Sequence, residues 1–126
     1  MADQARRDRG APGGGGPGSP LSGRVAIVTG AAGGLGRATV QALRQAGAAV
    51  VPVDVHGDGC LIADVATAEG NRQMVDLALE RHGRLDILVL NAGAQAMNPI
   101  AGYAEADWDR LMDVMVKGQR CTARSV

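Results

Sequence analysis

Residues 29–36 read TGAAGGLG and form a glycine-rich segment that could bind phosphate groups. The segment follows an apolar run and precedes a helical pattern, which is the context in which such a turn binds a dinucleotide. Gly30 would permit a tight turn, a missing side chain at Gly34 would let the backbone approach a pyrophosphate, and Gly36 would let the helix pack closely. Unpaired N–H groups at the helix N-terminus would then face the phosphates. The alternative is a glycine-rich turn with a purely structural role.

An acidic residue, Asp54, ends the next apolar run along the chain. A carboxylate at this place can accept hydrogen bonds from both hydroxyls of an adenosine ribose, and it would repel a 2′-phosphate. No arginine or lysine occurs at 55–59, and Gly33 leaves the glycine-rich segment without a basic side chain. This pattern favours NAD over NADP as the cofactor. An ordinary polar residue at a strand end is the alternative.

Two further groups of polar and small residues follow apolar runs. Asp64-Val65 comes after the third run, and Asn91-Ala92-Gly93 comes after the fourth. The carboxyl ends of parallel strands meet at one edge of a sheet, where ligands bind in open α/β folds. We therefore expect both groups to line the same crevice as the glycine-rich segment.

The elements that must position these residues are apolar runs that alternate with helical patterns. The runs cover 25–28, 49–53, 60–63 and 86–90. Between and after them, apolar residues recur at helical spacing within 35–46, 74–81 and 108–115, the last through Trp108, Leu111, Met112 and Met115. The alternation predicts an α/β fold with a Rossmann-type parallel sheet of strand order 3-2-1-4 and flanking helices, incomplete at the C-terminus.

Composition limits the domain organisation and the classes of partner. Residues 1–22 are rich in glycine and proline and are expected to form a disordered tail, while 23–126 would form a partial dinucleotide-binding domain. The 13 basic and 13 acidic residues balance, so we expect neither nucleic acid nor an anionic membrane as a partner. Cys60 and Cys121 lack metal-ligand spacing, so no metal site is predicted. No apolar run approaches a membrane span, and a cytoplasmic location is expected.

With these residues assembled, residues 21–118 resemble the classical short-chain dehydrogenase/reductase family. The family's TGxxxGxG, acidic, Asp-Val and NNAG motifs are matched, with Leu90 in the first place of the last motif. The resemblance implies an oxidoreductase that moves hydride between NAD and a small hydroxy or keto compound, as a homo-oligomer when full length. The cofactor-binding residues that it implies are Thr29, Gly30, Gly34, Leu35, Gly36, Asp54, Asp64, Val65, Asn91, Ala92, Gly93 and Val114.

A narrower resemblance rests on NAGAQAMNPIAGY and the following WDRLMDVMVKG. Both segments are similar to the 3-hydroxybutyrate dehydrogenase branch of the family. By that match, Gln95 could hydrogen-bond the carboxylate of a small substrate. A polar loop residue without a binding role is the alternative.

The family's catalytic tyrosine and lysine are not matched, so no catalytic residue is predicted. The single tyrosine, Tyr103, is followed four residues later by Asp107, and the single lysine is Lys117. Met115 stands where many members have a catalytic asparagine, and its place in the apolar stripe predicts core packing.

Residues 119–126 are polar and are expected to be irregular. We therefore expect a truncated or frameshifted product, which is marginally stable and has the fourth strand as an exposed edge. A non-catalytic NAD-binding module and a non-functional fragment are the alternatives to an enzyme.

Overall fold

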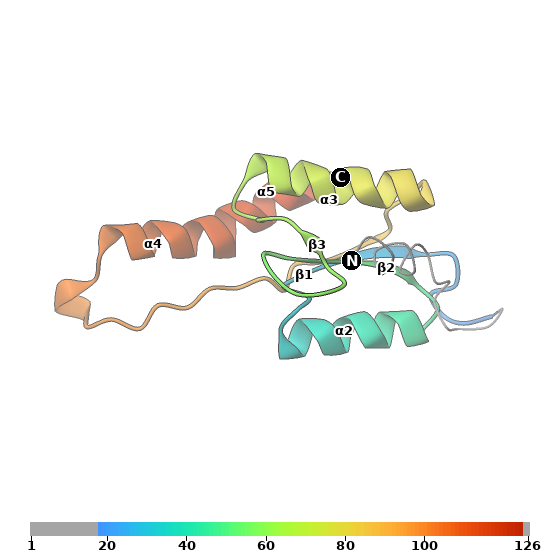
Figure 1. The fold of residues 1–126 in the computed structure, drawn as a ribbon, viewed down its shortest axis with the longest axis horizontal. Helices are drawn as coiled ribbons and strands as arrows, with labels where there is room; N and C mark the ends of the chain where they lie inside the picture. Colours follow the sequence, from blue (N-terminus) through green and yellow to red (C-terminus); the bar gives the residue numbers. More distant parts are fainter. Residues whose placement is uncertain (1–17, 125–126) are drawn as a thin grey trace.

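The computed structural model describes residues 18–124, and the predicted tail up to residue 17 lies outside this range (Figure 1). Residues at 19–22 form turns against the end of the first helix: the N–H of Leu21 donates to the carbonyl of Ala46 at 2.9 Å. Gly47 has φ +98°, and a Cβ there would lie 2.8 Å from Cβ of Ser19. The hydrogen-bonded part of the chain therefore begins upstream of the predicted boundary at residue 23.

Four parallel strands form one sheet in the order β3-β2-β1-β4, which confirms the predicted order. The strands are β1 (Val25–Thr29), β2 (Ala49–Asp54), β3 (Leu61–Ile62) and β4 (Ile87–Val89). Strand β1 is central, and all five of its residues are buried, as its continuous apolar run predicts. Pro52 lies in β2, but β3 pairs only with Val53 and Asp54, so at the proline β2 has a neighbour on the β1 side alone.

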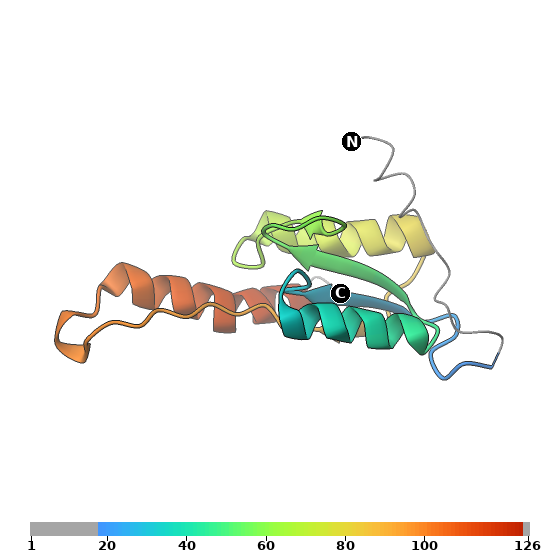
Figure 2. The ribbon, with the colours of Figure 1, turned by 60° about the horizontal axis from the view of Figure 1, so that its bottom comes forward.

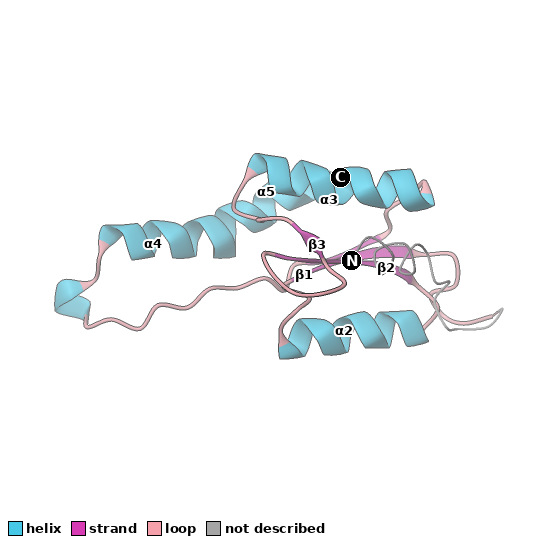
Figure 3. Cartoon of the chain, in the orientation of Figure 1, coloured by secondary structure: helices cyan, strands magenta, loops and turns pink. Residues whose placement is uncertain are grey.

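Helices cover both faces of the sheet (Figures 1 and 3). Helix α2 (Gly34–Gln45) lies on one face, and α3 (Ala68–His82) lies on the other, with α5 (Gln119–Arg124) in contact with α3. Helix α3 is capped at both ends. The hydroxyl of Thr67 accepts the N–H of Gly70 at 3.0 Å, and Gly83 ends the helix with φ 71°. The described residues contain no helix with the length and apolar character that a membrane crossing requires.

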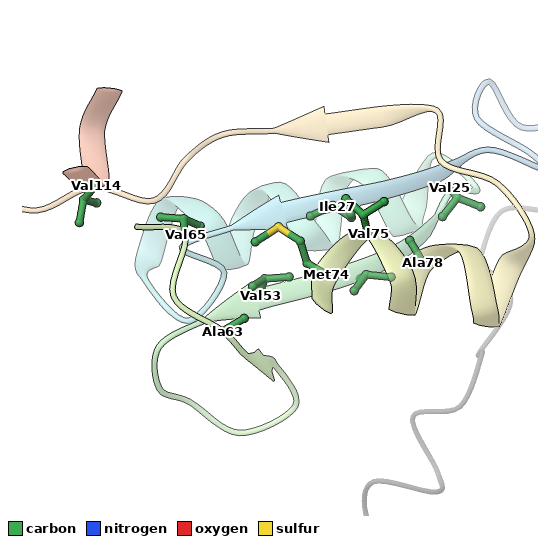
Figure 4. Packing of buried hydrophobic residues seen from close by; sticks show 10 residues of the cluster. Val25, Ile27, Val53, Ala63, Val65, Met74, Val75, Ala78 and Val114 are labelled. Atoms are coloured by element: carbon green, nitrogen blue, oxygen red, sulfur yellow. The ribbon is translucent and has the colours of Figure 1, made fainter. Parts of the chain in front are cut away.

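The main hydrophobic core lies between α3 and the sheet (Figure 4). Ile27 and Val53 from the sheet and Met74 and Ala78 from the helix are fully buried there. At the other end of the sheet, the carboxylate of Asp86 accepts the N–H of Val25 at 2.9 Å. The Arg84 guanidinium, which hydrogen-bonds Asp86, holds the pKa of this carboxyl well below its usual range, and the Val25 N–H adds to that effect. These contacts fix the start of β4 beside β1.

After β4 the chain leaves the sheet as an arm, which we define as residues 94–112. It consists of an extended segment, the 3-10 turn η1 (Ile100–Gly102) and helix α4 (Glu105–Met112), and two views show it projecting away from the sheet (Figures 1 and 2). The chain then returns through a π-helical stretch, η2 (Asp113–Gly118), to α5.

Two expectations about this part of the chain were wrong. Met115 is 43% exposed and belongs to neither core cluster; its sulfur instead accepts the N–H of Ala94 at 3.4 Å, on the segment after β4. Residues at 119–124 form helix α5 and are not irregular. The buried Thr122 explains the helix: its hydroxyl hydrogen-bonds the buried side chain of Asn71 and lies 2.9 Å from the carbonyl oxygen of Gly118.

Candidate functional site

A cavity of about 480 Å³ opens at the carboxyl ends of the strands, between the first turn of α2 and the base of the arm. This volume is typical of small-molecule sites. Most of the predicted binding residues line it. They are Gly30, Gly34, Leu35, Gly36, Asp54, Asp64, Val65, Asn91, Ala92, Gly93 and Val114.

The glycine-rich turn is held so tightly that two of its glycines cannot be replaced without displacement. Gly30 has φ +66°, and a Cβ there would lie 2.9 Å from Cα of Ala92. A Cβ on Gly36 would overlap the carbonyl oxygen of Gly30. Gly34 is different, because a Cβ there would meet nothing within 4 Å. The fold therefore does not require a glycine at position 34. The absence of a side chain there leaves the backbone open to the cavity.

Thr29 and Asn91 fasten this turn to the end of β4. The hydroxyl of Thr29 accepts the N–H groups of Asn91 and Ala92, each at 3.1 Å. The side-chain amide of Asn91 donates to the carbonyls of Thr29 at 3.1 Å and Gly30 at 3.2 Å. Thr29 is fully buried and lies beneath the cavity, so its place in the motif has a structural explanation. We call Thr29, Gly30, Gly36, Asn91 and Ala92 the crevice floor.

Helix α2 begins at the cavity without a side-chain cap. Its N-cap residue, Gly33, offers no acceptor, and the first turn contains no acidic side chain. Leu35 is exposed in this turn. The first backbone N–H groups of a helix have no partner within the helix, and together with the helix dipole they favour an anion. This end of α2 is therefore suited to a phosphate group.

The carboxylate of Asp54 is fixed by the backbone on both sides. One oxygen accepts the N–H of Ala32 at 2.9 Å, and the other accepts the N–H of Val55 at 2.7 Å. The sequence did not indicate the first of these bonds, which ties the end of β2 to the glycine-rich turn. Cys60 is nearby: burial raises the pKa of its thiol, and the negative charge of Asp54 raises it further.

Asp64 and Val65 are positioned by the start of α3. One oxygen of Asp64 accepts the N–H of Ala66 at 2.9 Å. The side-chain amide of the buried Asn71 donates to the carbonyl of Val65 at 2.8 Å. On the other side, a Cβ on Gly118 would lie 2.6 Å from the same carbonyl oxygen. Val65 and Val114 thus bring two buried apolar side chains to the cavity (Figure 4).

Three side chains singled out by the sequence, those of Gln95, Tyr103 and Lys117, do not line the cavity. Gln95 is exposed on the extended segment after β4 and does not line the cavity. Tyr103 lies on the arm, half-buried, and Lys117 forms an ion pair with Asp113 at 3.6 Å. The described structure therefore gives no reason to assign either of them a catalytic role. Among the residues 18–124, no group of three or more His, Cys, Asp or Glu could hold a metal ion.

Two residues with ionisable side chains line the cavity although the sequence interpretation had not selected them. His56 follows Asp54 by two positions in the short link between β2 and β3, and it is exposed. Arg110 lies on α4, four residues before Val114. The signal that could have found Arg110 is this spacing, since residues four apart share one side of a helix.

Comparison with known proteins connects this geometry to a family. Residues 24–126 match the family model described as short chain dehydrogenase. An uncharacterised oxidoreductase of Listeria monocytogenes is 31% identical over 114 residues, covering 78% of this chain and 46% of that protein. D-threitol dehydrogenase of Mycolicibacterium smegmatis is 32% identical over 114 residues, covering 78% of this chain and 44% of that protein.

The fold is also found among solved structures. A short-chain dehydrogenase/reductase of Brucella melitensis, described as a glucose/ribitol dehydrogenase, superposes with a TM-score of 0.79 at 29% sequence identity. The match covers 83% of this chain and 51% of that one. The present chain spans about half the length of the curated relatives it matches.

Proposed function

Since this chain belongs to the short-chain dehydrogenase family, we propose that it supplies the NAD-binding region of an oxidoreductase. The reaction transfers hydride between the nicotinamide and a small alcohol or ketone, and the bound cofactor supplies the hydride chemistry. NADP is the less suitable cofactor.

The observation that carries this proposal is the placement of Asp54 beside the glycine-rich turn. The carboxylate lines the cavity, and backbone N–H groups hold it on both sides. A fixed carboxylate at this end of β2 can accept the ribose hydroxyls of NAD and repels a 2′-phosphate. Gly34, whose backbone is open to the cavity, is where the pyrophosphate would approach.

We assign each of the following cavity residues a role in holding the dinucleotide. The first turn of α2 would bind the pyrophosphate through backbone N–H groups, and Asp54 would orient the adenosine ribose. Val65 and Val114 would pack against the adenine, and Asp64 would hold its edge. Asn91 supports the floor of the site by hydrogen-bonding the turn. Ala92 and Gly93 leave room beside that floor for the rest of the cofactor.

A second candidate function, binding of NAD without turnover, is favoured by a specific observation. The family's proton-transfer step uses a tyrosine and a lysine four residues later, and the sequence has Tyr103 followed by Asp107 in that relation. NADH fluorescence together with a dehydrogenase assay separates the two candidates. Binding without turnover supports the module, turnover supports the enzyme, and the absence of binding refutes both.

The substrate is proposed more narrowly as a small hydroxy acid or keto acid, as in the 3-hydroxybutyrate branch. Gln95 would hydrogen-bond its carboxylate. Among the described residues, no hydrogen bond engages the side chain of Gln95, so its amide is available to a substrate. Titrating acetoacetate into the chain with NADH bound, and repeating this with Gln95→Ala, tests the assignment. If the wild type and Gln95→Ala bound acetoacetate with equal affinity, Gln95 would be excluded as a substrate-binding residue.

The cofactor preference is tested by Asp54→Asn, which keeps an oxygen that can accept the N–H of Ala32 but removes the charge. We expect NADH to bind about tenfold more weakly, while NADPH binds equally well or better, since charge-assisted hydrogen bonds contribute about 1.5–3 kcal/mol. The matched control is Asp58→Asn, because Asp58 is exposed in the same link and does not line the cavity. An equal loss of affinity for NADH and for NADPH in Asp54→Asn would contradict the preference for NAD.

A further inference from the structure

We propose that Arg110 is a nucleotide-binding residue whose guanidinium covers the adenine ring of the dinucleotide. This inference deepens the proposed function and rests on it. It assigns a role to a side chain of the arm that lines the cavity and that the sequence interpretation had not selected as a binding residue.

Arg110 is the uncommitted charged side chain of the cavity. The two carboxylates of the lining already accept backbone N–H groups: Asp54 from Ala32 and Val55, and Asp64 from Ala66. Arg37, on the first turns of α2, donates to the carbonyl of Ala32 at 3.1 Å. Among the described residues, no hydrogen bond or ion pair engages the side chain of Arg110. Its guanidinium is therefore available to a ligand.

The place of Arg110 follows from the helix that carries it. Val114 is buried against the core cluster that contains Val65, so it fixes one side of the helix toward the adenine end of the cavity. Arg110 lies four residues earlier, on the same side and about 6 Å farther along the helix axis. The arm projects away from the sheet (Figure 1), and Arg110 belongs to its helix α4, whereas Val114 belongs to the returning stretch η2. The valines would contact the inner part of the adenine, and Arg110 its outer part.

The chemistry of the lining favours a planar aromatic group at this place. An arginine guanidinium is planar and stacks on the face of an aromatic ring, while a lysine ammonium is a compact point charge. The carboxylates of Asp54 and Asp64 attract the guanidinium toward the cavity, and the same negative charges disfavour a phosphate between them. Adenine satisfies all of these groups, since it offers a π face to Arg110 and apolar contact to Val65 and Val114.

The test compares fragments of the dinucleotide in titration calorimetry. We expect Arg110→Ala to weaken AMP and NADH by about three- to tenfold, as expected for a cation–π contact that is partly desolvated. Nicotinamide mononucleotide, which lacks adenine, should bind with unchanged affinity. Arg81→Ala is the matched control, because Arg81 is exposed on α3 and does not line the cavity; it should bind all three ligands as the wild type does.

The outcomes separate this inference from the proposed function. If the wild type binds AMP or NADH and Arg110→Ala binds them equally well, the inference fails and the function stands. If Arg110→Lys binds AMP and NADH as tightly as the wild type does, and its affinity for 2′,5′-ADP rises more than its affinity for AMP, Arg110 binds a phosphate and the inference is overturned. If the wild type binds neither AMP nor NADH, both fail. Circular dichroism of each variant, unchanged from that of the wild type, shows that the fold is intact.

Discussion

The arm begins two residues after Ala92 of the crevice floor, yet the two regions are held in opposite ways. On the floor, Thr29 and Asn91 use side-chain groups to bind backbone, and Gly36 has no room for one more carbon atom. On the arm, the side chains of Met97 and Ile100 are 85% and 97% exposed. Within a few residues, the chain therefore passes from a tightly packed, hydrogen-bonded region to one in which large apolar side chains are exposed.

This difference has a physical cause in the geometry of the sheet. The floor lies where two parallel strands and a helix N-terminus converge, so backbone polar groups must be paired within a small space. The arm projects away from the sheet (Figure 2), and its large apolar side chains Met97, Ile100 and Trp108 are exposed. A contiguous exposed apolar surface on a protein commonly marks a place of association. Substitutions should therefore destabilise the floor and change only the association of the arm.

The largest effect is expected for Gly36→Ala. Its Cβ would overlap the carbonyl oxygen of Gly30 and come within 2.8 Å of the side-chain nitrogen of Asn91. Because backbone must move to admit it, we expect a loss of about 3 kcal/mol in the free energy of unfolding and no measurable NADH binding. Urea denaturation and NADH fluorescence measure the two effects.

Gly34→Ala is the control for that prediction, since a Cβ at Gly34 meets nothing within 4 Å. We expect its stability to equal or slightly exceed that of the wild type, because alanine replaces glycine in a helix. NADH binding should nevertheless weaken, as the methyl group would stand where the pyrophosphate approaches. If Gly36→Ala were as stable as Gly34→Ala, the floor would not be tightly specified and the comparison would fail.

A smaller effect is expected where the returning chain is anchored to the packed half of the molecule. Asn71→Ala removes donors to the carbonyls of Val65 and Thr67 and the acceptor for Thr122, all of them around a fully buried side chain. Leaving buried polar groups unpaired should lower the free energy of unfolding by about 2 kcal/mol. Thr122→Ser keeps the hydroxyl and should lower the free energy of unfolding by less than Asn71→Ala does. Equal stability of Asn71→Ala and the wild type would show that α5 is not anchored by this pair.

The sequence predicted the regions where burial alone decides the structure. The apolar run of β1 indicates a strand buried on both faces, and the helical spacing within 74–81 indicates the helix that the structure places at Ala68–His82. The strand order follows from the handedness of the crossovers. Asp54 could be placed at the cavity because the carboxyl ends of parallel strands share one edge.

The remaining features depend on contacts between residues far apart in the chain. No local pattern pairs Asn71 with Thr122, so helix α5 was expected to be irregular. Helical periodicity identified the stripe that includes Trp108 and Met115, but periodicity cannot tell whether such a stripe is buried in the core or stays partly exposed, as these two side chains do. The bond from Ala32 to Asp54 likewise joins a turn to a strand end that only the folded sheet brings together.

The smallest effect on stability is expected on the arm, where Met97→Ser and Ile100→Ser replace the most exposed of its large apolar side chains. Neither residue belongs to a core cluster, so the free energy of unfolding should change by no more than about 0.5 kcal/mol. Self-association, followed by sedimentation velocity over a range of concentrations, should fall because less apolar surface is removed from water in the associated state. Leu79→Ser is the control, since Leu79 is exposed on α3 away from the arm and should leave association unchanged. A fall in stability for Ile100→Ser as large as that for Gly36→Ala would show that the arm, too, is packed in solution, and the contrast with the crevice floor would disappear.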